Sequence, residues 1–325
     1  PVSIPYTTAA SQFLYGSNVI FAALRARRRK LYHLYLHPRF EGRSDTDKHD
    51  TVIAAAKRAG IPVQKHTDLA LMDKMSGSRP HNGAVLEASK LPAPPVLALG
   101  KVEGGRVALE LERQSREESE VNGSPEAFEV LKRTWRQPFL LFLDGILDPG
   151  NLGGILRSAH FFGVDAVAVA TNTCATLDSA VVAKASSGAC EALRLFSIPK
   201  PSAFIHDSRE AGWKIHAAVA PDAGNGRRQI MSAEIATKSP LAEHPVILML
   251  GAEGAGLRAN LVKHADKLVS IQQGERAGNM PDVGLDSLNV GVAAGVLIEA
   301  FLRKPVGAQS RASEERTADT GDLGF

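Results

Sequence analysis

The sequence predicts an α/β protein with a small N-terminal α/β/α domain and a larger C-terminal domain built on a parallel sheet. Three observations support this. The chain has 325 residues, long enough for about two domains of roughly 150 residues each. After Pro138, short apolar runs alternate with helical patterns, which is typical of a parallel sheet covered by helices on both faces. Before residue 92, a shorter alternation of the same kind predicts a separate small unit.

The N-terminal elements follow one another closely. Apolar residues at positions 19, 20, 23 and 24 recur at helical spacing, and the segment LYHLYL at 31–36 is typical of a strand. Residues 51–59 are again helical, and Gly60 ends that pattern. A turn at 81–83 precedes a short strand at 84–86. Residues 102–111 alternate like a hairpin strand, so we assign 1–111 to the first domain.

A stretch rich in proline, glycine and charge separates the two halves. Its part 112–125, ERQSREESEVNGSP, is polar enough to be solvated or disordered, and we place a linker at 112–137. The second domain then spans 138–304, and the polar residues 305–325 are expected to form a disordered tail. We expect strands at 139–143, 166–170, 193–198, 215–219, 246–250 and 268–271, and a last long helix at 287–302.

Composition excludes several classes of protein. Hydrophobic residues make up 44% of the chain and charged residues 22%, which is ordinary for a soluble globular protein. The net charge of +3 permits an anionic partner without requiring one. The two cysteines, Cys174 and Cys190, are too few for a disulfide scaffold or a four-cysteine zinc site. No apolar run approaches the ~20 residues of a membrane-spanning helix.

Three separated segments carry the residues that could perform chemistry: LDGILDPGNLGGILRSAHFFG at 143–163, LGAEGAGL at 250–257 and DSLNVGVAAG at 286–295. In the first segment an apolar strand ends in a turn, and a helix is expected to open near Leu152, with Asn151 as its N-cap and Gly163 at its end. Each segment reads as the carboxyl end of a strand that leads into a loop or helix. In open α/β sheets, ligands bind at that edge.

Together these segments resemble the three motifs of the TrmH branch of SPOUT methyltransferases, which move a methyl group from S-adenosylmethionine to an RNA ribose. The resemblance covers most of the second half and implies a deep trefoil knot, a homodimer and a reaction without a metal. LYGSNVIFAAL at 14–24, with HNGAV at 81–85, resembles the RNA substrate-binding domain of many TrmH relatives. Within the family, the chain is most similar to eukaryotic mitochondrial enzymes that modify a guanosine of large-subunit ribosomal RNA.

The resemblance implies a set of catalytic residues: Asn151, Arg157, Glu253, Ser287 and Asn289. Arg157 would grip an RNA phosphate and stabilise the alkoxide that forms on the ribose oxygen. The family assigns this arginine as the base, although an arginine pKa above ~12 makes the neutral form rare. Asn151 would orient Arg157 or the ribose as well as capping its helix, and Glu253 would hold the arginine or the hydroxyl. Ser287, taken alone, is typical of a helix N-cap.

The family pattern also places Gly251, Ile271 and Leu288 around the adenine and ribose of S-adenosylmethionine. A glycine at 251 would let the backbone approach the ligand closely. The sequence departs from the family where Gln272 and Gln273 replace the usual Pro-Met, and where the link to residue 287 is longer. We therefore expect the loop 272–286 to have a shape of its own.

The N-terminal domain contains a basic run, RARRRK at 25–30. A solvated helix end is one explanation, and contact with RNA is the other. Phosphate contacts of this kind give salt-dependent affinity without sequence choice. The residues expected to contact RNA are Arg25, Arg27, Arg28, Arg29 and Lys30.

Other kinds of site are less well supported. Asp144 and Asp148 could form a metal-binding pair, but a single pair lacks further ligands, and Asp148 fits better as a turn former before Pro149. GAEGAGL lacks the lysine of a P-loop, and GNLGG lacks the spacing of a dinucleotide fingerprint. No GxSxG elbow supports a serine hydrolase.

The resemblance therefore implies a homodimeric, S-adenosylmethionine-dependent RNA (ribose-2′-O)-methyltransferase acting on large-subunit ribosomal RNA, with no metal and no membrane. A tRNA 2′-O-ribose methyltransferase is the alternative within the family. A non-catalytic RNA-binding ribosome assembly factor is the alternative outside it, and the complete set of catalytic residues argues against it. Because the chain begins at Pro1, we expect that an upstream segment was removed, and an organelle transit peptide is one explanation. The expected location is the mitochondrial matrix, otherwise the cytoplasm.

Overall fold

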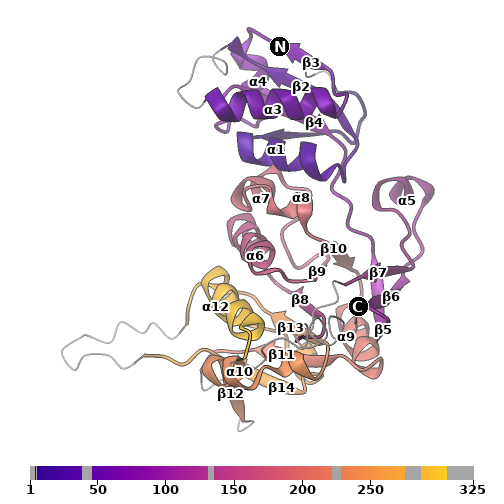
Figure 1. The fold of residues 1–325 in the computed structure, drawn as a ribbon, viewed down its shortest axis with the longest axis vertical. Coiled ribbons are helices and arrows are strands. Elements are labelled where there is room, and N and C mark those ends of the chain that lie inside the picture. Colours follow the sequence, from indigo (N-terminus) through magenta and orange to yellow (C-terminus); the bar gives the residue numbers. More distant parts are fainter. Residues whose placement is uncertain are drawn as a thin grey trace, which may run out of the picture.

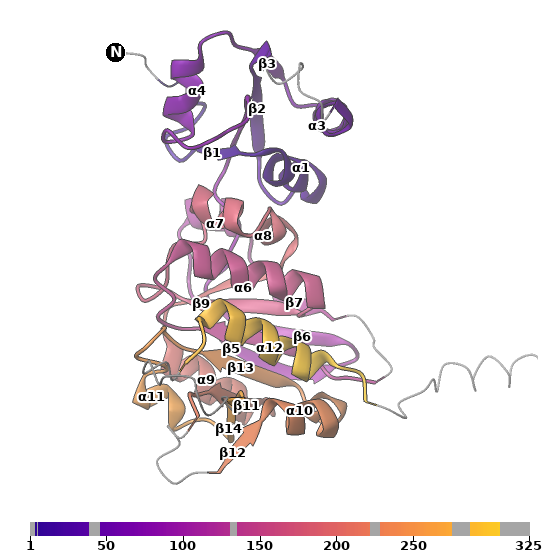
Figure 2. The same cartoon turned by 90° about the vertical axis from the view of Figure 1, so that its left-hand side faces the viewer.

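Two domains are stacked along the long axis of the computed structural model (Figure 1). The structure describes residues 4, 6–38, 46–130, 135–221, 228–274 and 287–305, with only the backbone described for 46–49. Between the domains, α7 (Ala180–Ala185) and α8 (Ala189–Ala192) lie between α1 (Ser17–Ala26) and α6 (Pro149–Phe162), as both views show (Figures 1 and 2).

The N-terminal domain is an α/β/α sandwich, as predicted. Its sheet has the strand order β1-β4-β2-β3, in which β4 runs antiparallel to both neighbours and β3 runs parallel to β2. Helices α1 and α3 pack on one face, and α4 packs on the other. Helix α3 starts earlier than predicted. The prediction missed its first turn, TDKHD, because that turn has no apolar periodicity. The elements are β1 (Gln12–Tyr15), β2 (Leu31–Leu36), α3 (Thr46–Arg58), β3 (Val63–Lys65), α4 (Leu69–Met75) and β4 (Ala84–Ala88).

The segment between the domains differs from the expected linker. Strands β5 (Val96–Glu103), β6 (Arg106–Leu111) and β7 (Ala127–Glu129) form a three-stranded antiparallel sheet. Its apolar residues share a core cluster with the parallel sheet of the second domain, so residues 102–111 pack there and not with the first domain. Helix α5 (Arg116–Asn122) has no buried residue, as a solvated segment should, but a capping box formed by Ser115 and Glu118 orders it.

The C-terminal domain confirms the predicted parallel sheet. Its seven strands are all parallel and have the order β10-β9-β8-β13-β11-β14-β12. They are β8 (Phe139–Leu143), β9 (Ala166–Ala170), β10 (Leu195–Ile198), β11 (Lys214–Ala218), β12 (Gln229–Met231), β13 (Val246–Leu250) and β14 (Lys267–Ser270). The remaining helices are α9 (Pro201–Glu210), α10 (Ser232–Lys238), η1 (Pro240–Ala242), α11 (Ala259–Val262) and α12 (Val290–Leu302).

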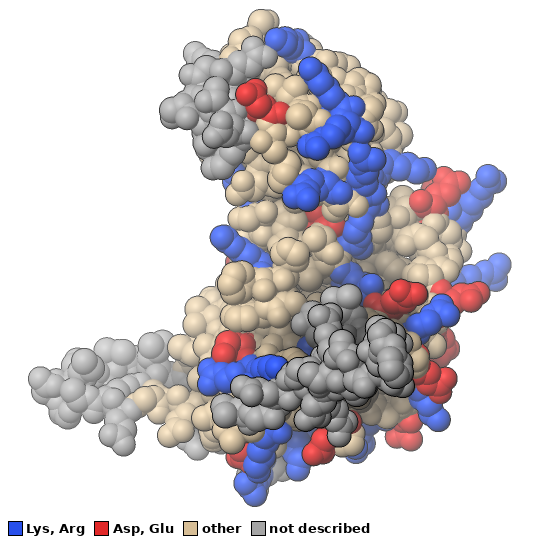
Figure 3. All heavy atoms as spheres, viewed as in Figure 1, with Lys and Arg blue, Asp and Glu red and all other residues tan. Residues whose placement is uncertain are grey.

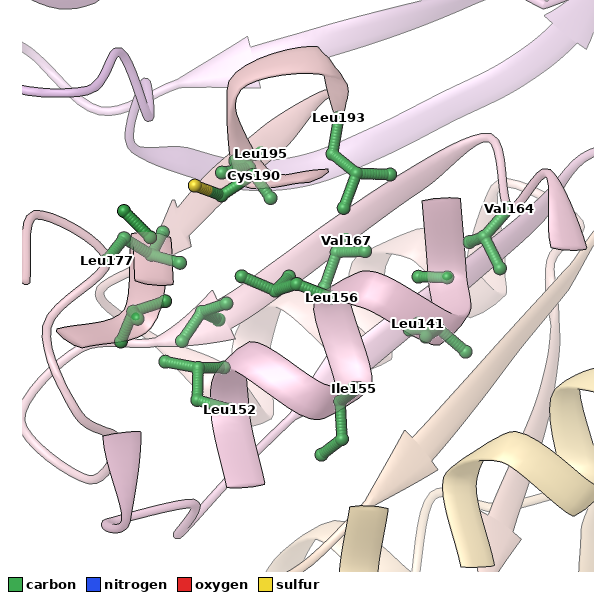
Figure 4. Close-up of a cluster of buried hydrophobic side chains, with 14 of the residues drawn as sticks. Leu141, Leu152, Ile155, Leu156, Val164, Val167, Leu177, Cys190, Leu193 and Leu195 are labelled. Atoms are coloured by element: carbon green, nitrogen blue, oxygen red, sulfur yellow. The ribbon is translucent and has the colours of Figure 1, made fainter. Parts of the chain in front are cut away.

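Both faces of this sheet are buried, which explains why its central strands are continuously apolar. Along β8, Phe139, Leu141 and Leu143 belong to the core beneath α6 and α12, and the alternate residues belong to the core beneath α9. Figure 4 shows Leu152 and Ile155 of α6 within the first of these cores. Burial of each such side chain contributes about 1.5–3 kcal/mol, so α6 is anchored firmly above the sheet.

Several expectations concern residues outside the described parts. These are the course of the loop over 275–286 and the tail over 306–325. The trefoil knot depends on the path of 275–286 and stays a prediction. None of the helices in the described parts of the chain has both the length and the apolar character needed to cross a membrane.

Candidate active site

The three motif segments meet at the carboxyl edge of the parallel sheet. Strands β8 and β13 are neighbours, and the pairing continues one residue further, because the amide of Asp144 donates to the carbonyl of Leu250 at 3.0 Å. Segments 143–163 and 250–257 therefore begin side by side. The third segment joins them because α12 packs against α6. The predicted convergence of the three segments is confirmed.

Helix α6 begins one turn earlier than predicted. Its N-cap is Asp148 and not Asn151. The Asp148 carboxylate accepts a hydrogen bond from the backbone amide of Asn151 at 2.7 Å. Pro149 occupies the first helical position, which its fixed φ favours. The predicted end is confirmed at Gly163, which has a φ of 81°. Because Asp148 caps the helix, the side chain of Asn151 is available for other contacts.

Three of the five predicted catalytic residues form a closed hydrogen-bonded triangle. The side-chain amide of Asn151 donates to Glu253 Oε2 at 3.2 Å, and the side-chain amide of Asn289 donates to Asn151 Oδ1 at 3.0 Å. The same Asn289 nitrogen lies 3.4 Å from Glu253 Oε1. Each residue comes from a different motif segment, so the triangle links all three at one solvent-exposed point.

Asn289 also caps the last helix. Its Oδ1 accepts from the backbone amides of Gly291 at 2.9 Å and Val292 at 3.3 Å. This fixes the side chain and turns its amide nitrogen toward Asn151 and Glu253. Because Asn289 is the N-cap of α12, Ser287 is not. Ser287 lies two residues upstream and is exposed.

Arg157 does not join the triangle. Six helical residues separate it from Asn151, which places the two side chains about 120° apart around the axis. Arg157 is exposed and forms no hydrogen bond or ion pair with any residue that the structure describes. The suggested contact between Asn151 and Arg157 is therefore not seen, since Asn151 bonds Glu253 and Asn289.

The loop that carries Glu253 is tightly folded. Ala252 and Gly256 exchange two backbone hydrogen bonds, at 3.1 and 2.9 Å. A Cβ on Gly251 would lie 2.3 Å from the backbone of Gly256 and Leu257. Glycine at 251 is thus required by the return of its own loop, which is a different reason from the ligand approach that the sequence suggested.

An ion pair missed by the sequence analysis supports this loop. Arg258 forks onto the buried carboxylate of Asp144, with Nε and Nη2 each donating at 2.8 Å, and Thr173 donates to the same carboxylate at 2.8 Å. The pair joins the loops that follow β8, β9 and β13. Asp144 and Asp148 therefore have other partners than a metal. In the described ranges, no group of three or more His, Cys, Asp or Glu residues is arranged to hold one.

The residues expected around S-adenosylmethionine follow the ends of parallel strands at the same edge. Gly251 follows β13, Ile271 follows β14 and is partly buried against the core, and Leu288 is an apolar side chain that is 48% exposed. The Oγ of Ser270 is buried and has no hydrogen-bond partner among the described residues, but alternation along the strand places it on the face of Leu268, opposite that of Ile271. The apolar side chains of Ile271 and Leu288 fit an adenine ring.

A cavity of about 460 Å³ lies at the opposite edge, where β11, β13 and β14 begin at Lys214, Val246 and Lys267. It is remote from the motif segments. His216 lines it, and burial lowers the pKa of this histidine to about 4.

The basic run divides into buried and exposed members. Arg29 is enclosed and forms an ion pair with Glu191 at 2.9 Å, and Arg28 donates to backbone carbonyls, including that of Pro92 at 3.2 Å. Burial lowers the pKa of the Arg28 guanidinium. The expectation that Arg29 contacts RNA is therefore corrected, because each of its nitrogens has an acceptor inside the protein, whereas RNA contact by the partly buried Arg28 stays a prediction.

Arg25, Arg27 and Lys30 remain exposed. The Arg25 guanidinium lies 5.5 Å from the centre of the Phe21 ring, and Arg27 donates to the carbonyl of Arg58 at 3.0 Å. Arg25 and Arg27 border a groove of about 500 Å³, and Lys and Arg side chains gather where α1 and α3 end (Figure 3). We call it the arginine groove, and its lining is Phe21, Leu24, Arg25, Arg27, Ala55 and Arg58.

Two family models match the chain. The model described as SpoU rRNA Methylase family matches residues 138–299, and the model described as RNA 2'-O ribose methyltransferase substrate binding matches residues 13–94. The two matches correspond to the parallel-sheet domain and the N-terminal sandwich.

Several characterised proteins are similar over most of the chain. The mitochondrial rRNA methyltransferase 1 of Schizosaccharomyces pombe is 31% identical, covering 90% of both chains. The human protein of that name is 30% identical over 90% of this chain and 73% of its own. The 23S rRNA (guanosine-2'-O-)-methyltransferase RlmB of Pseudomonas putida is 29% identical over 90% and 97%. An AdoMet-bound rRNA methyltransferase from Sinorhizobium meliloti shares the fold, with a TM-score of 0.62 at 20% identity over 92% and 89%.

Proposed function

This chain belongs to the SpoU rRNA methylase family, and on that premise we propose that it methylates the 2′-hydroxyl of a guanosine ribose in large-subunit ribosomal RNA, with S-adenosylmethionine as the methyl donor. The observation that carries the proposal is the triangle of Asn151, Glu253 and Asn289, which joins three distant segments at the carboxyl edge of the sheet. Relatives that are about 30% identical are named as rRNA methyltransferases, and the name of the Pseudomonas putida protein specifies the guanosine 2′-oxygen of 23S rRNA.

The triangle prepares Glu253 to orient a hydroxyl group. When bound, S-adenosylmethionine supplies a methyl group attached to a sulfonium. The neutral thioether that remains is a good leaving group. A ribose hydroxyl is a poor nucleophile, so the protein must align it and stabilise the charge that develops on its oxygen. The two amide donors fix the Glu253 carboxylate and leave it lone pairs that can accept from a hydroxyl. We assign Glu253 this role, with Asn151 and Asn289 holding it in place.

Arg157 supplies the positive charge. It is exposed, and its guanidinium is a planar donor group of the kind that recognises phosphate. A guanidinium can fork onto the phosphate beside the target ribose and also stabilise the forming alkoxide. In this mechanism the hydroxyl proton passes along its hydrogen bond to the Glu253 carboxylate, so Arg157 acts by charge and position and does not need to accept it.

We propose a homodimer that forms through an apolar face on α6 and α12. Phe161 on α6 is 82% exposed, and Val292 and Val296 on α12 are 54% and 38% exposed. These helices pack against each other, so their exposed apolar residues lie on neighbouring helices, and exposed apolar surface of this kind marks protein interfaces. Arg157 lies one helical turn before Phe161 and therefore borders this face. Phe161→Glu should convert the dimer to a monomer in sedimentation, whereas a wild-type monomer would contradict the proposal.

The arginine groove is the proposed RNA surface of the N-terminal domain. Arg25, Arg27 and Arg58 lie together there, and the described residues that line the groove include no acidic side chain. Replacing all three with Gln should flatten the salt dependence of RNA binding, because each lost phosphate contact lowers the slope by roughly 0.7. Lys214→Gln, at the opposite edge of the second domain, is the matched control. An unchanged slope in the triple variant would exclude the groove as a phosphate site.

The proposed compartment is the mitochondrial matrix. Similar proteins from fission yeast, budding yeast and human carry mitochondrial names, and the ribosomal RNA of that organelle is made and assembled in the matrix. Imaging of the full-length protein with a C-terminal tag would test this.

Mapping the methylated nucleotide tests the function directly. Purified protein is incubated with radiolabelled S-adenosylmethionine and unmodified mitochondrial large-subunit RNA, and the label is located by nuclease mapping. We expect one ribose 2′-O-methylguanosine, and transfer reduced by at least about 10²-fold with Arg157→Ala. Label on a base, or label only on transfer RNA, would refute the proposed substrate.

A further inference from the structure

A buried ion pair joins the two domains, and the proposed chemistry does not use it. The side chains of Arg29 and Glu191 are 1% and 0% exposed. Arg29 Nε lies 3.0 and 2.9 Å from the two carboxylate oxygens, and Nη2 donates to Oε1 at 2.9 Å. The third nitrogen donates to Gln12 Oε1 at 3.0 Å and to the carbonyl of Ser89 at 2.9 Å. Every nitrogen of Arg29 therefore has an acceptor inside the protein.

Arg28 strengthens the same junction from the N-terminal side. Its guanidinium donates to the carbonyls of Cys190, Leu193 and Pro92. The first two carbonyls lie in α8 and at its end, beside Glu191. Two consecutive arginines that follow α1 thus hold the short helix α8 through its side chain and its backbone. We call these contacts the arginine clamp.

Backbone packing continues from the clamp to the catalytic edge. A Cβ on Gly188, just before α8, would lie 2.6 Å from Ala22 Cβ, so α1 rests on this turn. On the other side, a Cβ on Gly153 of α6 would lie 2.4 Å from Ala185 Cβ of α7. Helix α6 carries Asn151 and Arg157. The helices α1, α7–α8 and α6 therefore form a closely packed stack between the arginine groove and the catalytic triangle (Figure 2).

We propose that Arg29 and Glu191 are positioning residues, which hold the RNA-binding domain in one orientation so that the target ribose reaches the catalytic edge. The inference rests on the proposed function. A buried ion pair contributes little stability compared with an apolar pair, but its forked geometry allows one arrangement of the two partners. That is the property needed to keep two binding surfaces of one RNA in register.

Glu191→Gln tests this through the direction in which the KM for RNA changes. If the clamp positions the RNA domain, the KM for RNA should rise about tenfold, because two RNA-binding surfaces that are no longer held in one orientation must be ordered when the RNA binds, while kcat and the Kd for S-adenosylmethionine stay within about twofold. If Arg29 instead contacted RNA, loss of the neighbouring negative charge would strengthen RNA binding and lower KM. Small-angle scattering should show a larger radius of gyration for Glu191→Gln than for the wild type.

Asp165→Asn is the matched control. It breaks a buried ion pair with Arg136, formed at 2.6 Å by side chains 1% and 8% exposed, that lies wholly within the catalytic domain. It should lower the thermal stability without a selective rise in the KM for RNA. Arg28→Ala is a milder variant that leaves Glu191 paired, and it carries the kinetic test if Glu191→Gln does not fold.

An unchanged or lowered KM in the clamp variants would overturn the inference, as would an equal rise with Asp165→Asn. The scattering measurement needs no RNA, so it also decides the case if the wild type methylates no ribosomal RNA. In that event the proposed function fails, and identical scattering curves for wild type and Glu191→Gln would show that the clamp does not fix the domains.

Discussion

The catalytic triangle and the arginine clamp are built in the same way and have opposite surroundings. Each joins polar residues far apart in sequence, by 102 residues for Asn151 and Glu253 and by 162 for Arg29 and Glu191. The triangle is exposed, so water can replace its hydrogen bonds when substrate moves them. The clamp is buried, and removing one partner leaves a charge that costs about 3–5 kcal/mol. Substitutions in the first region should therefore change rate, and those in the second should change orientation and stability.

The largest effect is expected at the exposed edge. Arg157→Ala should reduce kcat by at least about 10²–10³-fold, because the proposed mechanism uses its positive charge to stabilise the forming alkoxide. Since Arg157 is exposed and bonds no described residue, the free energy of unfolding should change by less than about 0.5 kcal/mol. Methyl-transfer assays and urea unfolding measure the two quantities. Arg157→Lys separates charge from the forked geometry, and lost cofactor affinity in calorimetry would contradict the assigned role.

A buried residue should show the reverse, a stability change without a rate change. The pKa of His216 is lowered by burial from 6.5 to about 4. Below pH 6.5 the unfolded chain takes up a proton that the folded protein does not bind until about pH 4, so stability falls across this window as the pH falls. The loss is on the order of 3 kcal/mol. His216→Leu should remove this component in urea unfolding between pH 7 and 4, and parallel profiles for both proteins would exclude it.

Asn289 both contacts Glu253 and caps α12, so two substitutions at this position can separate its effect on rate from its effect on stability. Asn289→Asp keeps a good helix cap but places a second carboxylate beside Glu253, and we expect kcat to fall about 10–100-fold with little change in stability. Asn289→Ala removes the cap as well and should cost a further ~1 kcal/mol of stability. If the aspartate variant retained full activity, Asn289 would be only a cap.

The parts of the fold that the sequence predicted are those whose local pattern is decided by burial. Strands β8, β9 and β13 were predicted with their observed bounds, because strands buried on both faces are continuous apolar runs. The short edge strand β12 was missed, since three residues carry no period. The start of α6 was misplaced because Asp148 and Asn151 are equally good caps, and Pro149 decides between them.

The parts that could not be predicted depend on partners far along the chain. RARRRK has the composition of a solvated surface, and only the fold shows that Arg29 forms an ion pair with Glu191. The fork between Arg258 and Asp144 spans 114 residues and has no local signature. Alternation predicted one hairpin strand over 102–111, which corresponds to β6 and the end of β5, but alternation does not tell which domain will bury its apolar face.

The smallest expected effect is that of a chelator, which should leave the rate of methyl transfer unchanged. Asp144 is held by Arg258 and Thr173, and Asp148 caps α6, so each aspartate already has hydrogen-bond donors in place of a cation. A chelator also strips Mg²⁺ from RNA, and a loss of activity could come from the substrate. RNA folded in monovalent salt removes this ambiguity, and Asp148→Asn, which preserves a cap, provides the second arm. Inhibition with that RNA, abolished by Asp148→Asn, would show that the exposed edge binds a metal after all.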